Sequence, residues 1–175
     1  TDCAFTLNAV AAASYFEDGT LPKPESSALN GGGFYGYYET ADGRYLSIGS
    51  LEPAFRKALC EAIGKPEILS LSFSNKKEDS ITFKEVLAET FFLKTLDEWL
   101  QIFEQVDACV EPVLTFDEVE KHPHFVERGL IVEVENENGE LQKQIACPIK
   151  SNNFTPQYKH VRSDDTNSIL DELTI

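Results

Sequence analysis

The sequence from residue 38 to residue 55 reads Tyr38-Glu39-Thr40-Ala41-Asp42-Gly43-Arg44-Tyr45-Leu46-Ser47-Ile48-Gly49-Ser50-Leu51-Glu52-Pro53-Ala54-Phe55. Asp-Gly between two short runs of apolar and aromatic residues predicts a β-hairpin with a two-residue turn. That turn sets the register of the strands: Tyr37 opposite Ile48, Glu39 opposite Leu46, and Tyr38 and Tyr45 on the other face. Pro53 suits the first position of a helix, so a helix should follow the hairpin directly.

A second hairpin is predicted around Asn138-Gly139, between Leu130–Glu135 and Leu141–Cys147. Its register would place Val132 opposite Ile145 and Leu130 opposite Cys147, with Glu133 and Glu135 facing Gln144 and Gln142 on the solvated side. Cys109–Leu114 is a short apolar run that predicts a further strand.

Helices are predicted on either side of these strands. The starts are marked by Pro53, with Gly64 after the end of that helix, and by three capping boxes, Thr82…Glu85, Thr95…Glu98 and Thr115…Glu118. An apolar segment from Asp2 to Phe16 predicts a buried helix, Asp164 to Leu173 a last helix, and residues 70–80 a mobile loop. This order of elements favours an α+β fold of antiparallel hairpins and packed helices over a parallel doubly wound sheet.

The charge excludes several classes of function. The chain has 175 residues, with 30 acidic and 15 basic side chains and a net charge of −15. Such a chain lacks the basic face that nucleic acid or an anionic membrane surface requires. No apolar run is long enough to span a bilayer, and the first residues lack the basic start of a signal peptide. The four cysteines are widely separated and form no CxxC pair, which indicates free thiols in the cytoplasm.

Glu52 is the most informative acidic residue. It follows a predicted strand and takes the N-cap position before Pro53, where Ser, Thr, Asp or Asn would serve better. The helix dipole favours its ionised form, so a carboxylate at this strand end could orient a catalytic group. From spacing alone a solvated first-turn glutamate is the simpler interpretation.

Other candidates carry weaker signals. Gly31, Gly32 and Gly33 could form a flexible lid or bring backbone N–H groups to a ligand, although from the residues alone a linker end is the simpler interpretation. His122-Pro123-His124 lacks a third ligand nearby, so no metal site is predicted. Cys109 lies in an apolar run, which predicts a buried thiol and not a nucleophile.

Several stretches together resemble the family III CoA-transferases, the CaiB/BaiF family, and within it the α-methylacyl-CoA racemase branch. They are residues 38–55, Asp97-Glu98-Trp99 with Phe103, Asp107-Ala108-Cys109-Val110-Glu111-Pro112-Val113-Leu114, Pro123-His124-Phe125 with Arg128-Gly129, and a degraded tail signature at 165–173. The chain departs from the racemase branch at Phe34, where a proline is usual, and at Ser163–Thr166.

The resemblance implies that this chain is the C-terminal portion of a longer protein. Residues 1–30 would be a helix and linker of a Rossmann-like large domain, 31–129 a small α+β domain, and 130–175 a hairpin and linker returning to the large domain. The catalytic base would lie in the large domain. Glu52 would then be a catalytic-site residue that orients this base, and Gly31–Gly33 would be substrate-binding.

The resemblance further implies an acyl-CoA substrate, an interlocked homodimer and no cofactor beyond the coenzyme A thioester itself. The reaction would interconvert (R)- and (S)-2-methylacyl-CoA by removal and return of the α-proton, and the chain alone would be inactive. Two alternatives stay open: CoA transfer between carboxylates, as in carnitine- or formyl-CoA transferases, and a non-catalytic interaction module that dimerises through its apolar first helix.

Overall fold

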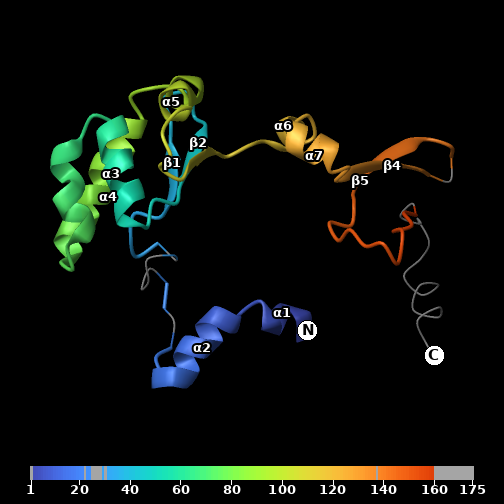
Figure 1. Cartoon of the computed structure of the whole chain (residues 1–175), viewed down its shortest axis with the longest axis horizontal. Helices are drawn as coiled ribbons and strands as arrows, with labels where there is room; N and C mark the ends of the chain where they lie inside the picture. The colour runs from blue at the N-terminus through green and yellow to red at the C-terminus, as the bar shows by residue number, and fades with distance from the viewer. Residues whose placement is uncertain (1, 22, 25–28, 30, 137, 160–175) are drawn as a thin grey trace. The chain divides into compact units, whose positions relative to one another are not determined.

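The computed structural model describes residues 2–21, 23–24, 29, 31–136 and 138–159. The chain divides into two compact units, Thr1–Val113 and Leu114–Ile175. Both contain helices and antiparallel strands, so the fold is mixed α/β with antiparallel hairpins (Figure 1). The predicted three-part division into 1–30, 31–129 and 130–175 stays a prediction.

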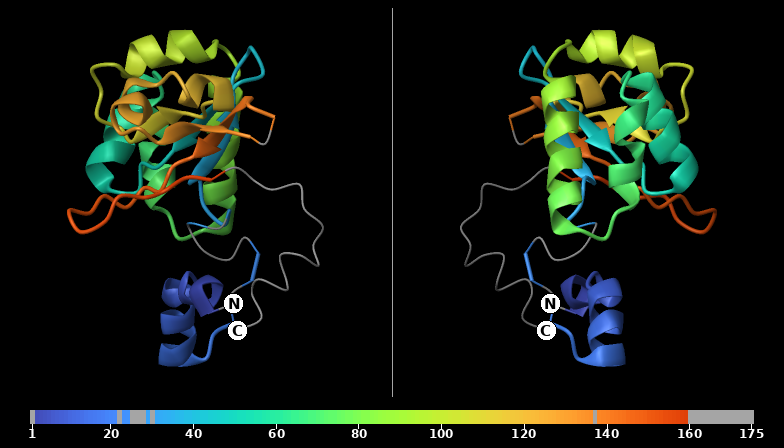
Figure 2. Two further views of the ribbon diagram at one scale, coloured as in Figure 1. Left: turned by 90° about the vertical axis from the view of Figure 1, so that its right-hand side faces the viewer. Right: turned by 90° about the vertical axis from the view of Figure 1, so that its left-hand side faces the viewer.

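The first unit is built on a three-stranded antiparallel sheet in the order β1-β2-β3. The strands are β1 (Gly36–Glu39), β2 (Tyr45–Ile48) and β3 (Val110–Pro112). The helical elements are α3 (Pro53–Ala62), the 3₁₀ helix η1 (Pro66–Phe73), α4 (Lys77–Phe91) and α5 (Leu96–Phe103). Helix α4 contacts β1, and both views of Figure 2 show it running alongside the strands.

The first hairpin forms where it was predicted, but its predicted register was wrong by one residue. Tyr37 lies opposite Ser47, Tyr38 opposite Leu46 and Glu39 opposite Tyr45. Tyr38 therefore shares the buried face with Leu46, whereas Tyr37 is exposed.

The cause of this shift is a three-residue loop in place of the predicted two-residue turn. The backbone N–H of Thr40 donates to the carbonyl of Arg44, and Gly43 adopts a left-handed φ of +72°. A turn closed by a left-handed glycine adds one residue to the loop and so moves every pair by one. Asp42 contributes further, because its Oδ1 accepts hydrogen bonds from the Thr40 hydroxyl and the Leu96 backbone.

The core of the first unit lies between the sheet and its helices. Helices α4 and α5 supply the predicted apolar stripes, and the buried side chains include Leu46, Ile48, Leu59, Phe83, Leu87, Phe91, Leu96, Trp99 and Phe103. Phe91 is at the centre of an aromatic cluster, with ring centroids 5.6 Å from Tyr38 and 5.1 Å from Trp99. The Trp99 Nε1–H donates to the Phe91 carbonyl at 2.9 Å, so this buried polar group is satisfied.

The predicted loop at 70–80 was wrong. Residues 70–73 belong to the 3₁₀ helix η1, and α4 begins at Lys77, five residues before the predicted cap Thr82. Thr82 lies inside α4, where its hydroxyl donates to the carbonyl of Glu78 at 3.0 Å. A threonine whose hydroxyl bonds back to the i−4 carbonyl lies inside a helix and does not mark its start. The capping pattern at 82–85 therefore predicted the wrong start for this helix. The boxes at 95–98 and 115–118 are confirmed.

The true and the false cap give a matched pair of stability predictions. Thr95→Ala should lower the free energy of unfolding by about 0.5–2 kcal/mol, because it removes the acceptor of the Glu98 N–H. Thr82→Ala should change the stability by less than about 0.5 kcal/mol, since alanine has the higher helix propensity. Urea unfolding of both variants measures the difference. Equal losses for the two variants would contradict this assignment of the helix starts.

The first helix differs from the prediction in two ways. It is split into α1 (Asp2–Thr6) and α2 (Ala9–Asp18), with a turn at Leu7 and Asn8. The prediction that it is buried was wrong for this chain: α2 has no buried residue, and Val10 is 84% exposed. The described part of the chain thus provides no cover for an apolar helix.

The second unit contains α6 (Phe116–Val119), α7 (Pro123–Glu127), β4 (Ile131–Glu135) and β5 (Leu141–Ile145). Strands β4 and β5 form the predicted second hairpin, but Ile131 and not Val132 lies opposite Ile145. Glu133 faces Lys143, so the predicted glutamate–glutamine face was wrong as well. The cause is the same as in the first hairpin: the Asn136 N–H donates to the Glu140 carbonyl, and Gly139 has a φ of +79°.

The predicted helix at 164–173 lies outside the described residues. Among the helices that the structure does describe, none combines the length and hydropathy needed to cross a bilayer.

Candidate functional site

Glu52 lies in the turn that joins β2 to α3. It is the N-cap residue of α3, with an extended backbone (φ −75°, ψ 147°) and Pro53 behind it at the start of the helix. Its side chain makes no capping hydrogen bond and is exposed. The structure thus places the predicted carboxylate at a strand end, with its oxygens not engaged by the helix that it precedes.

The backbone before Glu52 is held against the start of β3. The buried hydroxyl of Ser50 donates to the carbonyl of Ala108, and the N–H of Gly49 donates to the carbonyl of Cys109 at 2.8 Å. A buried hydroxyl that is satisfied in this way fixes the local backbone, since breaking the bond would leave a carbonyl without a partner. The position of Glu52 is therefore set by residues almost sixty positions further along the chain.

Arg56, which the sequence analysis missed, holds the other side of the same turn. Its Nε donates to the carbonyl of Leu51 at 2.9 Å, and its Nη1 donates to the carbonyl of Ser72. Its guanidinium also lies over the rings of Phe34 and Phe73, at 5.3 and 5.0 Å from their centroids. The one signal in the sequence was an arginine four residues after Glu52, which is too common a spacing to single out.

The predicted burial of Cys109 was wrong. Its neighbours Ala108 and Val110 are buried, whereas Cys109 is exposed and has a φ of 51°. The left-handed backbone at this position turns the side chain outward from the apolar run. Desolvation by the surrounding chain raises the pKa of the thiol, and the negative charges of Asp107 and Glu52 raise it further. A raised pKa lowers the fraction of the thiolate, which is the reactive form, and so disfavours a role as nucleophile.

Gly31, Gly32 and Gly33 line a cavity of about 640 Å³ together with the residues that lead into α4. The Nζ of Lys84 lies 3.4 Å from the carbonyl of Gly31. Gly31 also borders a second cavity of about 370 Å³ that includes Tyr35, and the Tyr35 ring lies close to Gly49. Glu52 lines neither of these cavities. The glycines and Glu52 are thus on connected segments of one unit, but the structure does not join them in one site.

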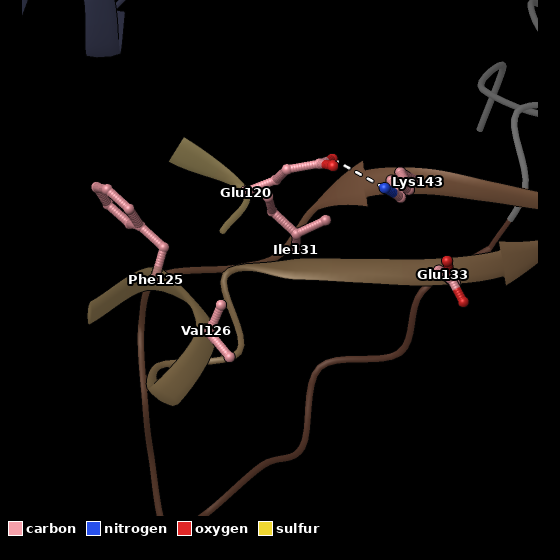
Figure 3. A pocket seen from close by; sticks show the side chains of 6 residues that line it. All are labelled: Glu120, Phe125, Val126, Ile131, Glu133 and Lys143. Atoms are coloured by element: carbon pink, nitrogen blue, oxygen red, sulfur yellow. Dashed lines mark hydrogen bonds and ion pairs between the residues drawn. The ribbon is translucent and has the colours of Figure 1, made fainter. Parts of the chain in front are cut away.

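A third cavity, of about 400 Å³, lies within the second unit (Figure 3). Phe125, Val126 and Ile131 form its apolar wall, and Glu120 and Lys143 form an ion pair of 2.9 Å across it. The carboxylate of Glu120 raises the pKa of Lys143. Exposed pairs of this kind contribute little stability.

The side chain of His122 bonds to the backbone at the start of α7. The Nδ1 of His122 accepts from the N–H of His124 at 3.3 Å and caps α7. Within residues 2–21, 23–24, 29, 31–136 and 138–159, no three or more His, Cys, Asp or Glu side chains cluster in a way suited to a metal ion.

Comparison with known proteins identifies the family. The model of CoA-transferase family III matches residues 1–162. This chain belongs to CoA-transferase family III. The family assignment made from the motifs is therefore confirmed.

The similar proteins of known activity include both a racemase and a transferase. The human alpha-methylacyl-CoA racemase is 39% identical over 118 residues, which cover 67% of this chain and 30% of the human protein. The formyl-CoA:oxalate CoA-transferase of Shigella sonnei is 28% identical over 162 residues, which cover 86% of this chain and 39% of that protein.

A solved structure supports the fold. A CAIB/BAIF family protein from Brucella suis matches with a TM-score of 0.60 at 20% identity, over 86% of this chain and 39% of that chain. At this identity the match speaks to the fold alone. The chain spans about one third of the length of the proteins that it matches.

Proposed function

We propose that this chain is the Glu52-bearing portion of a 2-methylacyl-CoA racemase. The observation that supports this best is the 39% identity to the human alpha-methylacyl-CoA racemase, against 28% to the formyl-CoA:oxalate CoA-transferase. The reaction removes the proton from the carbon next to the thioester, gives an enolate, and returns a proton on the opposite face. The α-proton is the only group that leaves and returns, so this reaction involves no change of oxidation state.

In this proposal Glu52 is a positioning residue. A general base needs a partner that fixes its orientation and adjusts its pKa, and an ionised carboxylate on a rigid turn provides both. The bonds of Ser50 and Arg56 to the surrounding backbone hold that turn in place. The base itself would come from a part of the protein beyond this chain, completed by homodimerisation, and the enzyme would be cytoplasmic.

CoA transfer between carboxylates is the second candidate. The alignment with the formyl-CoA:oxalate CoA-transferase supports it, because that alignment covers 86% of this chain. A transferase needs a nucleophilic carboxylate that forms an acyl–enzyme intermediate. In this second candidate that carboxylate would lie in a part of the protein beyond this chain, as the base of the racemase would.

The two reactions are distinguished by the fate of the α-hydrogen. The full-length protein that carries this chain should exchange the α-hydrogen of (S)-2-methylacyl-CoA for deuterium in deuterium oxide, and it should produce the (R) epimer without added carboxylate. Mass spectrometry and chiral chromatography measure both. Transfer of CoA to formate or oxalate without α-exchange would refute the racemase. The 175-residue chain alone should show neither reaction.

A further inference from the structure

The largest of the cavities described above is lined by lysines. Lys76, Lys77 and Lys84 surround the cavity of about 640 Å³ beside Gly31–Gly33, together with Ser74 and Ser80. Lys76 and Lys77 lie at the start of α4, and Lys84 lies two turns further along the same helix. In a chain with only 15 basic side chains, three of them thus border one hollow.

These lysines have no carboxylate partner among the ion pairs found in the described part of the chain, which are Lys57–Glu61, Lys121–Asp117 and Lys143–Glu120. The ammonium group of Lys84 donates to the neutral carbonyl of Gly31. The nearby carboxylate of Asp79 accepts a hydrogen bond from the Ser74 hydroxyl. The three lysines of this cavity therefore form no close ion pair with a described carboxylate, although Glu78 and Asp79 lie in the same first turn of α4.

Helix stability does not explain this arrangement. A positive charge at a helix start is opposed by the helix dipole, and lysine is a poor N-cap. Lys76 occupies the N-cap of α4, makes no capping bond, and is followed at once by Lys77. Glu78 and Asp79 in the first turn suit the dipole, so the two lysines alone are the locally unfavourable choice at this helix start.

We propose that this cavity binds a phosphate group, with the three lysines as its counter-charges. Lysine binds phosphate as a point charge, and glycines let backbone groups approach a ligand closely. The phosphates could be those of a coenzyme A thioester or free phosphate ions, and the chemistry of recognition is the same. This site is independent of the reaction proposed above, because both a racemase and a transferase would take a coenzyme A ester.

Calorimetric titration of the 175-residue chain at low salt tests the proposal. Pyrophosphate should bind, and its affinity should fall as salt is added. Because the net charge of −15 repels anions in general, binding at low salt would indicate a specific site. Coenzyme A and pantetheine separate the two sources. Binding of coenzyme A but not of pantetheine assigns the cavity to the coenzyme, and binding of pyrophosphate alone assigns it to free phosphate.

Substitution of the lysines locates the site. Lys84→Gln should weaken pyrophosphate binding about threefold to fivefold, and the double variant Lys76→Gln/Lys77→Gln about tenfold or more. Lys57→Gln and Lys121→Gln, which remove exposed lysines outside the cavity, should leave the affinity unchanged. Absence of pyrophosphate binding, or equal weakening by Lys57→Gln, would overturn the proposal. The titration measures binding and not turnover. A failure of the racemase assay would therefore not affect the conclusion about phosphate binding.

Discussion

Replacing Glu52 by glutamine in the full-length protein is expected to lower kcat about 100-fold, which is about 2.7 kcal/mol of activation free energy. Glutamine keeps the shape of the side chain but removes the negative charge that would orient and polarise the base. Because the side chain makes no capping bond in α3, its replacement should cost only the interaction with the helix dipole, less than about 1 kcal/mol of stability. Steady-state kinetics of epimerisation measures the effect.

A pH profile separates this role from a merely structural one. A carboxylate beside a base raises the pKa of that base, so its loss lowers the pKa. The acid limb of the kcat/KM profile should therefore move to lower pH in Glu52→Gln, and Glu52→Asp should restore part of the rate. Glu61→Gln is the matched control, since Glu61 is an exposed glutamate on the same helix. An unchanged rate in Glu52→Gln would remove Glu52 from the site.

Replacing Phe91 by alanine is expected to lower the free energy of unfolding by about 3–5 kcal/mol. Phe91 is 0% exposed and contacts the rings of Tyr38, Trp99 and Phe103. The substitution removes a large apolar surface and leaves a cavity in the centre of the first unit. Urea unfolding followed by the fluorescence of Trp99, the one tryptophan of the chain, measures the loss.

The neighbouring residue supplies the control for this prediction. Phe92 is 56% exposed, so Phe92→Ala should cost less than about 1 kcal/mol. If Phe91→Ala is too unstable to study, Phe91→Leu should show a smaller loss in the same direction. Similar losses for the two alanine variants would contradict the placement of the core.

The sequence was sufficient for the hairpins and most helices, because their signals are local. Asp42-Gly43, Pro53, Gly64 and the Thr95 capping box each act within a few residues. The register was missed at both hairpins because a left-handed glycine fits a two-residue and a three-residue loop equally well. The start of α4 was missed since a Thr-x-x-Glu pattern also occurs inside helices.

The candidate site was only partly predictable for a different reason. The position of Glu52 follows from local sequence, but the bonds that hold its turn come from Ala108, Cys109 and Ser72. Such long-range contacts leave no spacing pattern in one sequence. The exposure of Cys109 was missed because its left-handed backbone breaks the alternation expected of an apolar strand.

A structure of the full-length protein with a bound 2-methylacyl-CoA gives the most direct test of the role of Glu52. The account predicts that the Glu52 carboxylate lies within hydrogen-bonding distance, about 3 Å, of a side chain that contacts the α-carbon of the ligand. A Glu52 carboxylate that points into bulk water, with no part of the protein or its partner subunit closing over it, would contradict the account.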